Sequence, residues 1–134
     1  MENIAHRQHH TIAFGDTDAS SWLHFPNIFR FIEATEHDFL KSRDVIVFDR
    51  ALGGWPRVHV QCDYHAPLVA GDEIEVILSL GKIGTTSLTW NFQVVRLPEQ
   101  LAASGQIVTV RVDATGKTQV ISEKERTALT RSNT

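Results

Sequence analysis

One segment limits the folds open to this chain more than any other: an apolar stretch with helical spacing, followed only by strand-like patterns. Apolar side chains recur in it every three or four residues, and Phe31 and Ala34 widen the stripe. The recurring side chains are Phe25, Ile28, Phe29, Ile32, Phe39 and Leu40. A helix that is apolar on so many sides needs cover on most of them. The segment therefore predicts one heavily buried helix, with Pro26 in its first turn, where a missing N–H costs little.

The rest of the chain is patterned as strands. Alternation of apolar and polar residues predicts strands within 57–65, 74–80, 88–94 and 108–112, with shorter candidates at 11–14 and 118–121. Residues 122–125 (SEKE) resemble a capping box that opens a small terminal helix. A strand, one long apolar helix and then a run of antiparallel strands predict an α+β layer fold. In it, a curved sheet of about five strands wraps round the helix.

Length and composition set broader limits. The 134 residues suit one domain, 1–134, with polar ends at 1–8 and 130–134 that we expect to be flexible. A net charge of −3 gives no general attraction to nucleic acid or to an anionic membrane. With neither a membrane-length apolar stretch nor a signal-peptide segment, we expect a cytoplasmic protein. Cys62, the single cysteine, excludes an intrachain disulfide, and its alternating apolar run predicts a packed core thiol.

Chemistry concentrates in residues 14–27 (FGDTDASSWLHFPN), where Asp16 and Asp18 lie in a loop that leads into the helix. The first turn of a helix offers unpaired N–H groups and partial positive charge, which stabilise an oxyanion. A carboxylate on the other side of the carbonyl can attack it, or take a proton from an attacking water. Such an arrangement is sufficient to hydrolyse a thioester. Taken alone, the spacing of the two aspartates favours a role as caps or turn formers over catalysis.

A resemblance to a known family favours the catalytic interpretation. The pattern aromatic-Gly-Asp-x-Asp at residues 14–18, followed by aromatic-Pro-Asn at 25–27, resembles the 4-hydroxybenzoyl-CoA thioesterase family of hot-dog proteins. Weaker similarity runs through 31–33 (FIE), Tyr64-x-x-Pro67 and later strands, over about residues 9 to 113. The resemblance implies a hot-dog fold and hydrolysis of an acyl-CoA or acyl-carrier-protein thioester to a carboxylic acid and a free thiol.

Carried over residue by residue, the resemblance implies specific roles. Asp18 is the catalytic carboxylate, as nucleophile or general base, the backbone N–H of Phe25 polarises the thioester carbonyl, and Asp16 hydrogen-bonds the loop. Coenzyme A, as part of the substrate, is expected along the sheet edge at Lys82, Thr85, Thr86 and Ser87. Candidates to line the substrate site are Trp22, His24, Asn27 and Trp55, with ordinary core or surface positions as the alternative.

Two departures from the family pattern bear on this site. Ser21 stands where the family usually has glycine, so a positive φ there would strain the turn. Residues 84–86 (GTT) replace most of a basic run that the related enzymes offer to CoA phosphates, which keeps a carrier-protein thioester open as the substrate.

Assembly, cofactors and rival functions complete the expectations. A single sheet round one helix leaves edges to cover, and hot-dog relatives form dimers or dimers of dimers with sites between subunits, so we expect a homo-oligomer.

No metal or redox cofactor is expected. The histidines at 6, 9 and 10 lack ligand partners at suitable spacing, and His59, Asp63 and His65 suit a solvated or packing face. The alternatives are a non-catalytic thioester-binding module and a hydratase or dehydratase of acyl thioesters, whose usual His–acid pattern is not matched.

Overall fold

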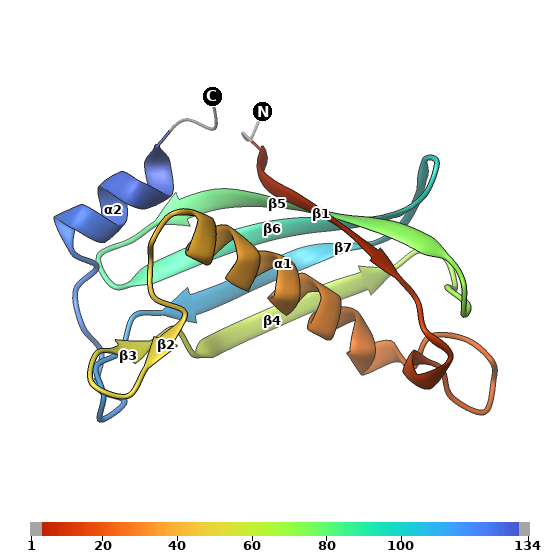
Figure 1. Ribbon diagram of the computed structural model, residues 1–134, viewed down its shortest axis with the longest axis horizontal. Coiled ribbons are helices and arrows are strands. Elements are labelled where there is room, and N and C mark those ends of the chain that lie inside the picture. Colours follow the sequence, from red (N-terminus) through yellow and green to blue (C-terminus); the bar gives the residue numbers. More distant parts are fainter. Residues whose placement is uncertain (1–3, 132–134) are drawn as a thin grey trace.

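The computed structural model describes residues 4–131 and consists of one antiparallel sheet with a long helix packed on one face (Figure 1). The order of strands across the sheet is β1-β5-β6-β7-β4, and every neighbouring pair is antiparallel. The strands are β1 (Ile4–Thr11), β4 (Arg57–Tyr64), β5 (Glu73–Ile83), β6 (Ser87–Arg96) and β7 (Gln100–Val110). This architecture confirms the predicted α+β fold with a five-stranded sheet round one helix.

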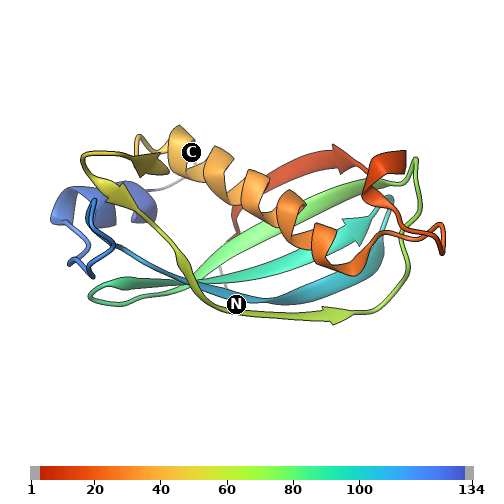
Figure 2. The ribbon, with the colours of Figure 1, turned by 90° about the horizontal axis from the view of Figure 1, so that it is seen from below.

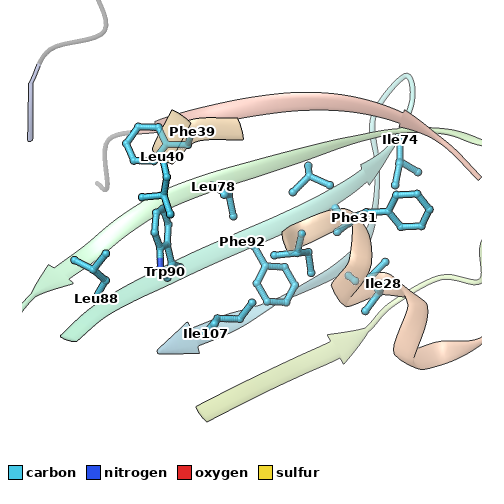
Figure 3. Close-up of a cluster of buried hydrophobic side chains, with 14 of the residues drawn as sticks. Ile28, Phe31, Phe39, Leu40, Ile74, Leu78, Leu88, Trp90, Phe92 and Ile107 are labelled. Carbon is cyan, nitrogen blue, oxygen red and sulfur yellow. The ribbon is translucent and has the colours of Figure 1, made fainter. Parts of the chain in front are cut away.

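Helix α1 (Ile28–Ser42) follows a 3-10 turn, η2 (Phe25–Asn27), and crosses the sheet obliquely (Figure 2). Its apolar stripe meets the inward-facing residues of β5, β6 and β7, as Figure 3 shows. The rings of Phe39 and Trp90 meet edge to face at a centroid distance of 5.8 Å. Pro26 lies in the 3-10 turn that begins the helix, as the sequence predicted.

Two small elements flank this core. Strands β2 (Phe48–Asp49) and β3 (Gly53–Gly54) form a short hairpin after α1. The chain ends in α2 (Glu123–Thr130), which begins with the predicted capping box: Ser122 and Glu125 exchange backbone-to-side-chain hydrogen bonds of 3.0 Å.

Three sequence predictions need correction. The strand placed at 11–14 is wrong, because the first strand is β1 and ends at Thr11. The inward side chains of β1 include His6, Gln8 and His10, so it carries no apolar alternation for a pattern to detect. Consequently residues 4–8 are strand rather than a flexible end. The candidate at 118–121 contributes one isolated bridge, from Thr118 to Val112, rather than a strand. The flexibility expected at 1–3 and 132–134 lies outside the described residues.

Strand β4 forms one edge of the sheet, and its apolar face is uncovered. The alternation that predicted inward-facing residues is real, but α1 leaves most of the strand uncovered and is joined to it by an ion pair at Arg57, its first residue. Val58, Val60 and Tyr64 are 62%, 46% and 46% exposed, and Cys62 is only half-buried, so the predicted core thiol is wrong for the single chain. The strand therefore presents an apolar face and an unpaired backbone edge together.

Candidate functional site

The loop that carries Asp18 is a tight turn closed by backbone hydrogen bonds. Thr17 and Leu23 form a β-bridge, the Asp18 N–H donates to the Trp22 carbonyl at 3.0 Å, and the Ser21 N–H donates to the Asp18 carbonyl at 2.9 Å. Ser21 has φ = 72°, in the left-handed region that favours glycine. The turn therefore does require a positive φ at the position where the family usually has glycine, and serine occupies it under strain.

Asp18 is held from both sides by neighbours in this loop. Its Oδ1 accepts hydrogen bonds from the Ser20 N–H at 2.8 Å and the Ser20 hydroxyl at 2.5 Å. Its Oδ2 lies 3.3 Å from Nδ1 of His24. The hydroxyl of Ser20, then its N–H, and then His24 lower the pKa of Asp18 below the ordinary 3.8. The group is thus an oriented carboxylate, ionised at neutral pH.

Asp16 anchors the loop, as predicted. Its Oδ2 accepts the Ala13 N–H at 2.8 Å, and its Oδ1 pairs with the guanidinium of Arg30 on α1. Its backbone carbonyl accepts from the His24 N–H and from the side-chain amide of Asn27, both at 2.9 Å. Asn27, predicted as a substrate-lining residue, therefore has a structural contact that ties the start of the helix to the loop.

The N–H of Phe25 is the group that this arrangement leaves available at the beginning of the helix. It has no acceptor within residues 4–131, whereas the next N–H groups of the turn donate internally, from Asn27 to the His24 carbonyl and from Ile28 to the Phe25 carbonyl. The hydroxyl of Tyr64, at the end of β4, also donates to the Phe25 carbonyl, at 2.5 Å. An unpaired amide thus follows directly on the residue that contacts Asp18.

In a single chain this site is open. The Asp18 side chain is 41% exposed, and three aromatic side chains of the same loop and the turn after it are exposed as well: Phe14 at 76%, Trp22 at 55% and Phe25 at 66%. His24 packs edge-on against Phe25, at 5.6 Å between ring centroids. Within residues 4–131, the carboxylate and the amide therefore lie on one side of an open surface, and the described residues do not enclose a substrate there.

The other predicted site residues lie at the far end of the sheet. The Asp18 loop adjoins the start of β5, because Ile12 and Leu23 donate backbone hydrogen bonds to Asp72 and Leu68. Residues 82–87 comprise the end of β5, the turn that follows it and the first residue of β6, at the opposite end of the sheet (Figure 1). Ten residues of strand separate Asp72 from Lys82, about 33 Å at the usual rise per residue. Within one chain, Lys82, Thr85, Thr86 and Ser87 are therefore not brought to Asp18.

Trp55 is also remote from Asp18. It is buried beside β3, and its indole N–H donates to the Ile46 carbonyl at 2.9 Å. It lines a cavity of about 510 Å³ between the β2–β3 hairpin and the later part of α1, with Phe48 and Arg57. Gly53 permits this packing, since it has φ = 93° and its missing Cβ would lie 2.0 Å from the Val112 carbonyl oxygen.

A buried ion pair borders the same cavity. Glu36 on α1 is 1% exposed, and its Oε1 lies 2.7 Å from the Arg57 guanidinium at the start of β4. Glu33, exposed on the preceding turn of the helix, lies 3.7 Å from the same guanidinium. Burial raises the pKa of Glu36 to about 7, against the opposing effect of Arg57. Of the two helix glutamates, Glu36 is the buried one, and its pair ties α1 to the edge strand.

Comparison with known proteins decides the family. The Thioesterase superfamily model matches residues 22–103, well over half of the chain. The chain belongs to the thioesterase superfamily. A 1,4-dihydroxy-2-naphthoyl-CoA hydrolase from Synechococcus sp. (strain CC9605) is 30% identical over 115 residues, which cover 80% of this chain and 76% of that one. The matched segment begins four residues after Asp18, so it includes the Phe25 turn but not the acid.

Solved thioesterases share the fold of this superfamily member. A 1,4-dihydroxy-2-naphthoyl-CoA thioesterase from Synechocystis has a TM-score of 0.84 at 19% identity and covers 92% of this chain and 94% of its own. A 4-hydroxybenzoyl-CoA thioesterase, solved with 4-hydroxybenzoyl-CoA, has a TM-score of 0.84 at 16% identity and covers 92% and 97%. These findings confirm the predicted hot-dog fold and the predicted class of thioester hydrolase.

Two further properties of the described residues concern membrane spans and metal sites. No helix within residues 4–131 is both long and apolar enough to cross a membrane. The same part of the chain contains no group of three or more His, Cys, Asp or Glu side chains placed to hold a metal ion.

Sequence reasoning missed two contacts at the site. Ser20 provides two hydrogen bonds to Asp18, and Tyr64 provides one to the Phe25 carbonyl. A serine two residues after an aspartate in a Gly/Asp/Ser-rich loop is a usual signal for such a turn. Tyr64 had a weaker signal: it ends an alternating strand and is the only tyrosine in the chain.

Proposed function

We propose that this thioesterase hydrolyses acyl-CoA thioesters at a site built on Asp18 and the N–H of Phe25. The observation that carries the proposal is the juxtaposition of an oriented carboxylate, 3.3 Å from His24, with an unpaired amide on the very next residue at the start of a helix. A thioester carbonyl between them accepts a hydrogen bond from the amide as negative charge develops on its oxygen. No metal or redox cofactor is needed for this chemistry.

Two routes use the same geometry. In the first, Asp18 attacks the carbonyl carbon, the thiolate of CoA leaves, and water hydrolyses the resulting mixed anhydride. In the second, Asp18 takes a proton from a water molecule that attacks the carbonyl directly. Rapid quenching of a single turnover with a radiolabelled acyl group separates them: the acyl group becomes covalently bound to the protein, at Asp18, only along the first route.

Aromatic acyl groups are the first substrates to test. The relatives carry names of hydroxylated aromatic acyl-CoA hydrolases, for 1,4-dihydroxy-2-naphthoyl-CoA and gentisyl-CoA among others. The exposed aromatic side chains around Asp18 offer stacking surface for such a ring. Because the single cysteine suits a reducing compartment, we also propose a cytoplasmic location.

We further propose that the working site lies between two copies of the chain. The free edge and apolar face of β4 suit antiparallel pairing with β4 of a second copy. Such pairing sets opposite ends of the two sheets side by side. It would bring Lys82 and the neighbouring turn of one chain, together with the Trp55 cavity, toward Asp18 of the other. That arrangement accounts for the separation of the predicted CoA-binding turn from the acid within one chain.

The decisive experiment measures thiol release from a panel of aryl- and alkyl-CoA thioesters by the wild type and by Asp18→Asn. The asparagine keeps the size of the side chain but removes its charge. We expect kcat to fall by at least about 100-fold with little change in melting temperature. Asp16→Asn is the matched control, because it weakens the buried anchor on Arg30 and should lower stability more than turnover. Unchanged turnover in Asp18→Asn would remove this residue from the proposal.

A further inference from the structure

We propose that Tyr64 is a positioning residue for the oxyanion amide, holding the Phe25 turn in place through its hydroxyl. This inference rests on the proposed function, because it gives Tyr64 a role only if the Phe25 N–H serves the reaction. The hydroxyl donates to the Phe25 carbonyl at 2.5 Å, a short bond for an O–H donor. The two rings also meet edge-on, with centroids 6.4 Å apart.

The amide in question belongs to the peptide between His24 and Phe25, and this peptide is fixed on both sides. Upstream, the His24 N–H donates to the Asp16 carbonyl at 2.9 Å, and the His24 carbonyl accepts the Asn27 N–H at 2.9 Å. Downstream, the Phe25 carbonyl accepts the Tyr64 hydroxyl. With both flanking groups held, the direction of the Phe25 N–H is set before a substrate arrives.

Tyr64 is the connection between this turn and the sheet. The other hydrogen bonds described for residues 24–27 run to the Asp16–Asp18 loop, within the turn or into α1. Tyr64, by contrast, ends β4, whose hydrogen-bonded partner is β7 in the body of the sheet. The Phe25 turn is therefore tied to the hydrogen-bonded sheet, and such support from a regular element favours a preorganised donor.

The hydroxyl keeps its proton throughout the useful pH range. Partial burial, with the adjacent Cys62 thiol, raises the pKa of Tyr64 to about 12. The tether therefore stays a hydrogen-bond donor from pH 5 to pH 9, and its removal should affect turnover equally across that range.

Tyr64→Phe is the test, since it deletes one oxygen and keeps the ring against Phe25. We expect kcat to fall about 10-fold at both pH 6 and pH 9, with KM for the best aryl-CoA of the panel changed less than about two-fold. Affinity for the corresponding non-hydrolysable CoA thioether should also stay within about two-fold, because it has no developing oxyanion. The matched control is Ser104→Ala, which removes a 2.9 Å hydroxyl contact to His65 on the outer face of the same sheet; its kcat should equal that of the wild type.

A labelled tyrosine gives a second readout. Because Tyr64 is the only tyrosine, biosynthetic 3,5-difluorotyrosine replaces this residue alone. Its more acidic hydroxyl still donates, so turnover should stay within about two-fold of the wild type at pH 6, and the ¹⁹F resonance should shift when the thioether binds.

The outcomes separate the two proposals. If the wild type releases no thiol from any thioester, the proposed function fails and the role of Tyr64 fails with it. If the wild type is active and Tyr64→Phe has the same kcat, the positioning role alone is overturned. A rise in KM at constant kcat, or an equal loss of kcat in Ser104→Ala, also overturns it.

Discussion

Ser20 and Ser21 are neighbours in the Asp18 loop, and each affects the acid differently. Ser20 stabilises the carboxylate through two hydrogen bonds, whereas Ser21 accepts a left-handed conformation that closes the turn. The two residues make separate predictions, one about the pH dependence of turnover and one about stability.

Ser20→Ala should move the acid limb of kcat/KM to higher pH. The hydroxyl of Ser20 is the largest contribution to the lowered pKa of Asp18, so its loss brings that pKa back toward 3.8. An ionised Asp18 is required on either proposed route, and activity therefore falls earlier as the solution is acidified. A pH–rate profile from pH 3 to pH 8 checks this, and Ser20→Thr, which retains a hydroxyl, should keep the wild-type limb.

Ser21→Gly should stabilise the protein by about 0.5 to 1 kcal/mol. A left-handed conformation costs an ordinary residue about 1 to 2 kcal/mol, and glycine gives back part of the gain through its freer unfolded chain. Denaturant unfolding monitored by tryptophan fluorescence measures the change. Ala19→Gly, a nearby loop position without a positive φ, should show no gain, and a gain there would contradict this explanation.

At the scale of elements, the buried pair between Glu36 and Arg57 couples α1 to the edge strand. The pKa of Glu36 is raised from 4.5 to about 7, so the folded state holds the proton more tightly than the unfolded state. The stabilisation that comes from this tighter binding of the Glu36 proton is fully present below pH 4.5 and is lost as the pH rises through 7.

Glu36→Gln should therefore flatten the pH profile of unfolding. From pH 5 to pH 8 the wild type should lose about 1 to 3 kcal/mol relative to the variant. The lowered pKa values of His10 and His37 act in the opposite direction near pH 6, so the difference between the two proteins is the quantity to measure. Glu33→Gln removes a neighbouring charge that helps to raise the pKa of Glu36 but keeps the buried carboxyl, so it should reduce the slope less than Glu36→Gln does.

The sequence predicted the elements whose apolar residues recur with a strong period. It did not predict the features that depend on contacts with residues far away in the chain. The helix was evident from spacing such as Ile28, Ile32 and Phe39. β1 was misplaced because its inward residues are polar, and two of them, His6 and His10, contact Asp38 and Thr35 of α1 at 2.7 and 3.0 Å. The Asp18 loop was found through its motif, whereas the contact of Tyr64 with Phe25 joins residues 39 positions apart and has no local signature.

For the whole molecule, the uncovered face of β4 predicts the assembly. Val60→Lys places a charge on this face and should reduce the particle to a single chain, as measured by analytical ultracentrifugation. Thiol release should fall with it, since one chain carries only one wall of the proposed site. Val120→Lys, at a valine outside β4 that is even more exposed than Val60, should retain both the wild-type mass and the activity. An active single-chain Val60→Lys protein would contradict the shared site.

The bare edge of β4 also has a consequence for a freshly synthesised chain. Before the proposed pairing with a second copy, each molecule displays eight residues of strand backbone and two exposed valines, with which another extended segment can pair. Production faster than pairing should thus yield insoluble material, and slower expression at lower temperature should recover the native particle.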